Sequence, residues 1–66
     1  MAHYRLIRTR SVVEVFINGR STTKVDAHQR NELRDYMTSV GLTPEEINHN
    51  VHELYLTNAI EFVVKD

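Results

Sequence analysis

Cysteine is absent from this chain of 66 residues, and the chain holds only one proline and two glycines. Without thiols it can form neither a disulfide nor a thiolate metal site. A chain this short buries only about 60% of the surface that its unfolded form exposes. Its core must therefore be compact or be completed by a partner. The length has room for one domain, residues 1–66.

Long hydrophobic runs are also missing, since no apolar run exceeds three residues. A membrane-spanning helix needs about 20 apolar residues, and a signal peptide needs an apolar stretch of about 7–15. We therefore expect a cytoplasmic protein without a membrane segment. Hydrophobic residues make up 41% of the chain and charged residues 26%, which is too apolar a composition for a disordered chain.

The sequence offers little for catalysis. A phosphate-binding loop needs several closely spaced glycines, and only Gly19 and Gly41 are present. Ser11, Ser21 and Ser39 are the serines, and none lies in a nucleophile-elbow sequence. So short a chain also has little volume with which to enclose a substrate. We expect a protein that is not an enzyme and has no cofactor.

Alternating apolar and polar residues predict two strands, His3–Arg8 and Val12–Ile17. Pairing them across Arg10-Ser11 sets Leu6 opposite Val15 and Tyr4 opposite Ile17, so that their apolar faces coincide. One long strand with a bulge near Arg10 is the alternative, because the apolar parity changes there.

Asn18-Gly19 is the sharpest local signal. Both residues tolerate the positive φ angles of a type I′ hairpin turn. We therefore expect a third strand at Arg20–Val25, whose side chains opposite the apolar face of Val12–Ile17 would be Arg20, Thr22 and Lys24. Such polar residues indicate a strand at a sheet edge.

Two helices are predicted to follow. Asp26 with Gln29 has the spacing of a capping box for the first, and Gly41 stands where a left-handed residue would end it. Its apolar stripe comprises Ala27, Leu33, Tyr36, Met37 and Val40. Thr43, Pro44 and Glu46 mark the start of the second helix, with Leu42 and Ile47 placed for a hydrophobic staple.

The second helix should end near Asn58, although residues 54–58 fit either a helix or a strand. Ala59–Lys65 alternates again and predicts a last strand. The order is β-β-β-α-α-β. We therefore expect an α+β fold with an antiparallel sheet of three to four strands and a helical hairpin packed on one face.

Charge is divided unevenly along the chain. Residues 1–34 hold seven Arg and Lys residues against three Asp and Glu residues, whereas residues 35–66 hold one against six. The division predicts either a basic face and an acidic face, or two halves that neutralise each other in one fold.

One group of residues has metal-ligand types at helical spacing: Glu46, His49, His52 and Glu53. Imidazole and carboxylate suit zinc or iron, but no further ligands are evident, so we expect a polar helix face and no metal. The same helix carries no Lys or Arg, which excludes it as a helix that reads DNA in a helix-turn-helix.

Binding is the remaining function. We expect a small interaction module that binds a protein partner and forms a homodimer, by analogy of size an accessory protein of a bacterium or phage. Phe16 and Val12 lie on the strand face away from the core, where a partner could cover them. The alternative is nucleic-acid binding through arginine-rich hairpins. The candidate contact residues are Arg5, Arg8, Arg10, Phe16, Arg20 and Lys24.

Overall fold

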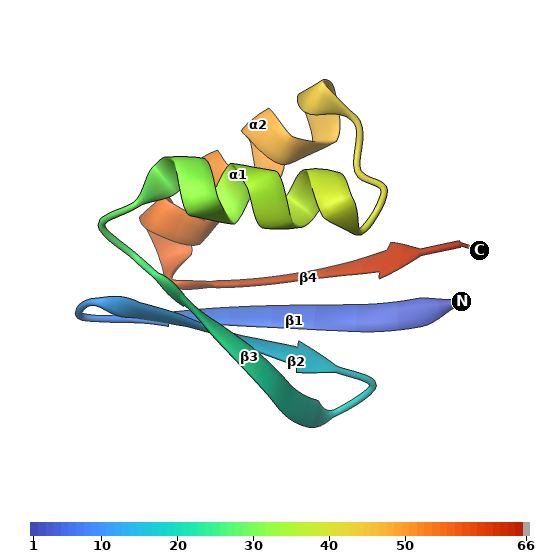
Figure 1. Cartoon of the computed structure of the whole chain (residues 1–66), viewed down its shortest axis with the longest axis horizontal. Coiled ribbons are helices and arrows are strands. Elements are labelled where there is room, and N and C mark those ends of the chain that lie inside the picture. Colours follow the sequence, from blue (N-terminus) through green and yellow to red (C-terminus); the bar gives the residue numbers. More distant parts are fainter. Residues whose placement is uncertain (66) are drawn as a thin grey trace.

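The computed structural model, which describes residues 1–65, is a four-stranded antiparallel sheet with two helices packed on one face (Figure 1). The sheet has the strand order β3-β2-β1-β4. The expected α+β architecture and element order are confirmed. The elements are β1 (Ala2–Thr9), β2 (Val12–Ile17), β3 (Arg20–Asp26), α1 (Arg30–Ser39), α2 (Pro44–Thr57) and β4 (Ala59–Val64).

The first hairpin has the predicted register. Leu6 lies opposite Val15 and Tyr4 opposite Ile17, so the apolar sides of β1 and β2 face the helices together. The alternative of a single strand with a bulge near Arg10 is wrong, because Arg10 lies in a tight turn between two separate strands.

The second hairpin turns at Asn18 and Gly19, whose φ angles of 51° and 86° are both positive. This confirms the predicted turn. The face assigned to Lys24 is wrong, however, because the β2–β3 register shifts between Val15 and Phe16. The shift places Lys24 opposite Glu14, on the face away from the helices.

The first helix begins later than predicted. Because β3 continues to Asp26, which pairs with Val12, Asp26 ends a strand and caps no helix. Its Oδ1 accepts a hydrogen bond from the His28 backbone N–H at 2.8 Å. The N-cap of α1 is Gln29, which makes no side-chain capping bond. The predicted Asp26–Gln29 capping box is therefore wrong.

The junction between the helices forms as the sequence predicts. Gly41 has a φ of 104°. The N–H groups of Gly41 and Leu42 donate to the carbonyls of Thr38 and Met37, which is a Schellman motif. Thr43 and Glu46 then form both hydrogen bonds of a capping box at the start of α2.

The open question about residues 54–58 is resolved in favour of a helix. α2 continues to Thr57, and Asn58 ends it in the left-handed conformation with a φ of 69°. Within residues 1–65, no helix is long and apolar enough to cross a membrane.

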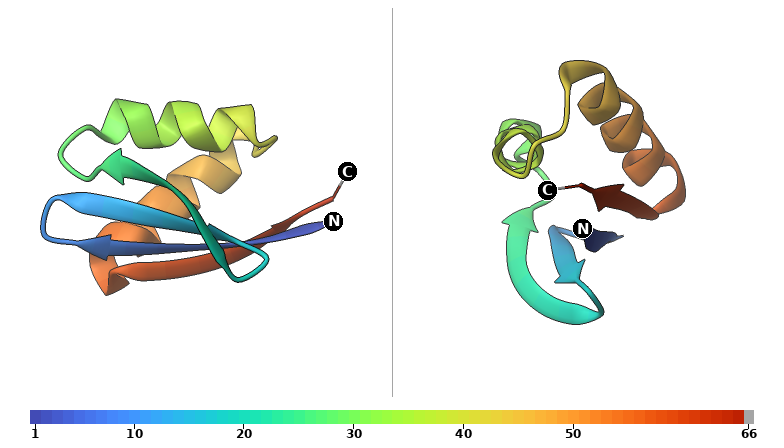
Figure 2. Two further views of the ribbon diagram at one scale, coloured as in Figure 1. Left: turned by 60° about the horizontal axis from the view of Figure 1, so that its bottom comes forward. Right: turned by 90° about the vertical axis from the view of Figure 1, so that its right-hand side faces the viewer.

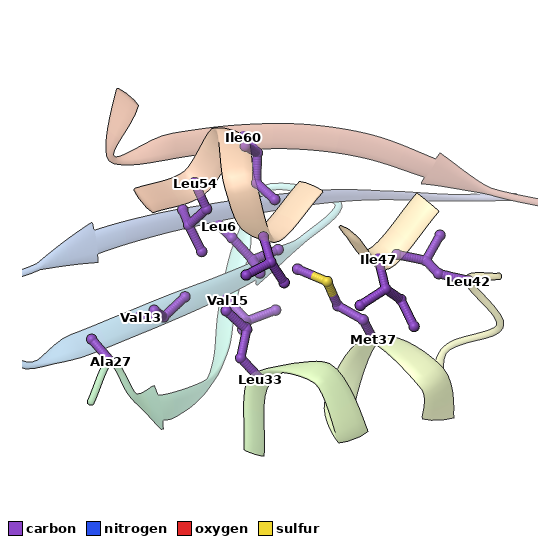
Figure 3. Close-up of a cluster of buried hydrophobic side chains, with 11 residues drawn as sticks. Leu6, Val13, Val15, Ala27, Leu33, Met37, Leu42, Ile47, Leu54 and Ile60 are labelled. Atoms are coloured by element: carbon purple, nitrogen blue, oxygen red, sulfur yellow. The ribbon is translucent and has the colours of Figure 1, made fainter. Parts of the chain in front are cut away.

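The core lies between the sheet and both helices (Figure 3). Leu6, Leu33, Met37 and Leu54 are completely buried and join three elements. Figure 2 shows from two further directions that the helices lie on the same side of the sheet. No helix or strand among residues 1–65 covers the other face (Figures 1 and 2). The buried apolar residues are Leu6, Val13, Val15, Ala27, Leu33, Met37, Leu42, Ile47, Val51, Leu54 and Ile60.

Candidate binding surface

The uncovered side of the sheet, which we call the outer face, is the broadest candidate surface (Figures 1 and 2). Side chains alternate along a strand, so each core residue of the sheet has neighbours that point to the outer face. β1 and β2 contribute the middle of this face and β3 and β4 its borders. Its main residues are His3, Arg5, Ile7, Val12, Glu14, Phe16, Lys24, Glu61 and Val63.

The middle of the outer face is partly apolar. Ile7, Val12 and Phe16 come from the two central strands, and each is half-buried. The bordering Val63 is 50% exposed, which makes it one of the most exposed large apolar side chains. Apolar side chains that stay partly exposed on an uncovered face can be covered by a binding partner.

Charged residues of both signs lie among and around these apolar residues: Arg5 is opposite Phe16 and Glu14 is opposite Ile7 on the central strands, and Glu61 and Lys24 lie on the borders. Arg5 Nε lies 3.8 Å from Glu61 Oε1, and His3 Nε2 lies 3.9 Å from the same oxygen. The Glu61 side chain is 58% exposed, so these pairs contribute little to stability. Lys24 lies opposite Glu14. The outer face is thus mixed in sign and carries no basic field.

A hollow of about 230 Å³ lies on the outer face. It is lined by His3, Arg5, Phe16, Gly19 and Glu61. Its volume lies below the range of about 300–1,000 Å³ that small-molecule sites usually have. The hollow is therefore small for a separate small-molecule ligand.

The six predicted contact residues do not form one patch. Arg5 and Phe16 are direct cross-strand neighbours on the outer face, and Lys24 shares that face. Arg10 lies in the turn between β1 and β2, whereas Arg20 lies at the opposite end of β2 beside Ile17.

Arg8 is on the helix side of β1, where its guanidinium lies 4.8 Å from the centre of the Tyr55 ring. Arg30, at the start of α1, lies over the same ring at 4.4 Å. The Tyr55 hydroxyl donates a hydrogen bond to the Ala27 carbonyl at 2.6 Å. Within residues 1–65, the buried Arg8 Nε has no hydrogen-bond partner.

These contacts create a basic end of the molecule that the sequence analysis missed. Arg8 and Arg30 lie there over Tyr55, and Arg10 lies in the β1–β2 turn; His28 lies beside Arg30 in a hollow next to Tyr55, and the Asp26 carboxylate accepts a hydrogen bond from the His28 N–H. The Ala27 backbone N–H donates to the Ser11 carbonyl at 2.8 Å, which holds the end of β3 against the first turn. The only available sequence signal was the excess of arginine in the first half of the chain.

Within residues 1–65, the pKa values of two groups depart from their usual values, and both groups lie outside the outer face. Hydrogen bonds from the backbone and then the side chain of Thr43 hold the pKa of Glu46 below its usual value. Burial, followed by the nearby Tyr4, raises the pKa of Tyr36 above its usual value. The first shift reflects the helix cap, and the second reflects packing of α1 on the sheet.

The histidines of α2 stay on its exposed side. His49 and His52 are exposed, and Glu46 is used in the capping box. Across residues 1–65, no three His, Asp or Glu side chains lie together in a way that could hold a metal ion. Comparison of the chain with protein families, with curated proteins and with solved structures found no match.

Proposed function

We propose that this protein is a small non-catalytic interaction module that binds a protein partner through the outer face of its sheet. The observation that carries the proposal is the uncovered sheet face, whose apolar middle at Ile7, Val12 and Phe16 is flanked by charges of both signs. An uncovered apolar surface gains free energy when a partner excludes water from it. Charges at the rim of an interface then select the partner and its orientation.

The mixture of charges on this face favours protein over nucleic acid as the ligand. Nucleic-acid binding rests on cations that neutralise phosphates, but Arg5 lies beside Glu61 and Lys24 lies opposite Glu14. Stacking of bases requires exposed aromatic rings, and Phe16 is the single aromatic residue among the main residues of the outer face defined above.

The experiment is recovery of partners from native lysate with the tagged protein, with and without nuclease. Phe16→Asp places a charge in the apolar middle and should abolish recovery of a nuclease-resistant partner. The matched control is Leu56→Asp, because Leu56 is 68% exposed and lies on α2, away from the outer face. Circular dichroism must show that both variants stay folded.

Recovery of the same partner by the wild-type protein and by Phe16→Asp would contradict the assignment of this face. Loss of the partner with both variants would show a general effect of added charge. A partner that disappears with nuclease treatment would move the assignment to nucleic acid.

The basic end supports nucleic-acid binding as a second candidate function. Arg8 and Arg30 both lie over the ring of Tyr55, and no ion pair to an acidic side chain is present for either within residues 1–65. Unneutralised arginines at one end could contact phosphates. The arginines of the two hairpins cannot act together, because Arg20 is at the far end of β2.

A mobility-shift assay at several salt concentrations tests this second function. Arg10→Ala and Arg30→Ala should each lower the slope of log affinity against log salt by about 1. Arg20→Ala is the matched control and should leave the slope unchanged. The absence of any shift at low salt would eliminate nucleic-acid binding at this end.

A further inference from the structure

β4 is an edge of the sheet, and its backbone groups point outward at alternate residues. The Arg8 N–H donates to the Asn58 carbonyl at 2.8 Å, which makes residues 8 and 58 a hydrogen-bonded antiparallel pair. Because such pairs alternate along a ladder, Ile60, Phe62 and Val64 bond to β1. The N–H and C=O groups of Glu61 and Val63 therefore point away from β1.

Neither Glu61 nor Val63 makes a backbone hydrogen bond on this outward side within residues 1–65. Ala59 differs, because its carbonyl accepts a bond from the Thr57 hydroxyl at 2.8 Å. A hollow of about 320 Å³, lined by Leu42, Glu46 and Val63 among others, lies beside the end of β4. In Figure 1 this end of β4 extends beyond α1. The second half of β4 thus offers free donors and acceptors.

The two edges of the sheet differ in how they are protected against pairing. β3 has a register shift and exposed polar residues from Arg20 to Lys24, which are features that discourage the addition of a strand. β4 pairs with β1 without a register shift. Its sequence is short and rich in β-branched residues, and its Val63 is 50% exposed. β4 is therefore the edge suited to accept another strand.

We propose that β4 pairs antiparallel with β4 of a second copy of this chain, with Val63 opposite Val63 of the partner subunit. This register places the outward backbone groups of the two copies against each other. It also sets Glu61 opposite Lys65 of the partner subunit, and the two-fold axis repeats this pair. On the helix side, Phe62 then faces Val64 of the partner subunit. Charge and apolar contacts are both complementary.

Charge selects this register over its neighbours. Pairing centred on Glu61 would set two carboxylates directly opposite each other, which is destabilising. Pairing centred on Phe62 would set each Glu61 against Val63 of the partner subunit. Only the Val63-centred register matches each Glu61 with a lysine. The existing contacts of Glu61 with Arg5 and His3 are exposed and near 4 Å, so the carboxylate can accept a further partner.

The dimer would have one continuous antiparallel sheet, with both helical hairpins on one side and both outer faces on the other. A two-fold axis perpendicular to the sheet produces this arrangement, because each copy contributes the same edge. The surface assigned to partner binding would then be present twice on one side. The proposed β4 pairing does not depend on the assignment of the outer face to partner binding. It uses backbone groups of β4 and not the apolar middle at Phe16.

Sedimentation equilibrium and amide hydrogen exchange over a range of concentrations test the pairing. We expect a monomer–dimer equilibrium in the range of about 10 μM to 1 mM, because a two-strand contact is a small interface. The amides of Glu61 and Val63 should exchange quickly in the dilute protein and slowly in the concentrated protein. The amides of Phe62 and Val64, which bond to β1, should be protected at both concentrations.

Charge-swap variants test the register. Lys65→Glu sets two carboxylates against each other at both ends of the contact and should weaken dimerisation by roughly tenfold or more. Glu61→Lys combined with Lys65→Glu restores opposite charges and should recover most of the affinity. Arg20→Glu makes the same charge change on the exposed β3 edge and should leave dimerisation unchanged. Circular dichroism confirms that each variant folds.

A protein that remains monomeric up to about 1 mM would overturn the proposal. A dimer that survives Lys65→Glu, or in which the Glu61 and Val63 amides gain no protection, would overturn it as well. A dimer lost on Phe16→Asp but not on Lys65→Glu would place self-association on the outer face and exclude this edge. Failure to recover a partner protein leaves these outcomes unaffected, so the two proposals can fail separately.

Discussion

Gly19 shows how a single residue determines a hairpin. Its φ of 86° lies in a region that costs an L-residue roughly 1–2 kcal/mol. A Cβ at this position would meet no atom within 4 Å. A substitution therefore changes the free energy of unfolding through the backbone conformation alone. The preceding Asn18 adopts a φ of 51°, and asparagine tolerates this region better than most residues.

We predict that Gly19→Ala lowers the free energy of unfolding by about 1 kcal/mol, whereas Gly19→Asn lowers it less. Urea denaturation followed by circular dichroism measures both. Equal losses for alanine and asparagine would show that the turn relaxes to another conformation.

The carboxylate of Glu46 makes the stability of the fold depend on pH. Its pKa is lowered in the folded state because Thr43 donates backbone and side-chain hydrogen bonds to it. The carboxylate therefore stabilises the fold at pH values above its unfolded pKa. This contribution is lost as the pH falls through the lower folded pKa.

We predict that Glu46→Gln makes the melting temperature less dependent on pH between about 5 and 3, because glutamine can accept the same backbone hydrogen bond without titrating. Thermal melts across this range measure the effect. Glu45→Gln changes the neighbouring carboxylate, which makes no capping bond, and should keep the slope of the wild-type protein.

The two helices differ in how their first turns are satisfied. α2 has a capping box at Thr43 and Glu46, whereas Gln29 makes no side-chain capping bond at the start of α1. The Gln29 carbonyl does accept from Glu32 and Leu33, so α1 is formed but its first N–H groups lack a side-chain acceptor. A substitution that supplies a side-chain acceptor at the start of α1 should therefore stabilise this helix.

We predict that Gln29→Asp raises the free energy of unfolding by about 1 kcal/mol, because its carboxylate can accept from the first turn and favours the positive end of the helix dipole. Urea denaturation measures the gain. Gln29→Ala offers no acceptor, and a gain of the same size with alanine would exclude capping as the cause.

At the scale of the whole molecule, stability depends on one small core shared by the sheet and both helices. A domain of this length has a free energy of unfolding of roughly 3–10 kcal/mol. Leu54 is completely buried, whereas Leu56 on the same helix is 68% exposed. Substituting each leucine in turn therefore compares a buried with an exposed side chain of the same type on the same helix.

We predict that Leu54→Ala costs about 2–5 kcal/mol and leaves the protein partly unfolded at room temperature. Leu56→Ala should stay within about 0.5 kcal/mol of the wild-type protein. The populations of folded protein are measured by urea denaturation and one-dimensional NMR. Similar losses from both variants would mean that α2 packs through a different face.

Much of the fold could be predicted because its signals are local. The turn at Asn18-Gly19 and the capping box at Thr43 depend on residues within a few positions of each other. The pairing of Leu6 with Val15 follows from apolar parity across one tight turn. The register shift between β2 and β3 could not be predicted, because the preference for packing Val25 against the core and keeping Lys24 outside depends on the helices that cover the sheet.

The binding surface was predictable only in part. Val12 and Phe16 were assigned to the face away from the core from strand alternation alone, and the structure places them there. The grouping of arginines failed, because residues close in sequence point to different sides of one strand. Arg5 faces the outer side and Arg8 faces Tyr55.

The sequence by itself determined the elements, their order and the turns between them, because backbone conformation responds to nearby residues. The tertiary structure decided which elements became edges and which charges met. Glu61 reaches Arg5 only because β4 returns to pair with β1. That return also leaves Glu61 and Val63 with outward backbone groups. Such neighbours arise from packing of the whole core, so no local pattern in the chain specifies them.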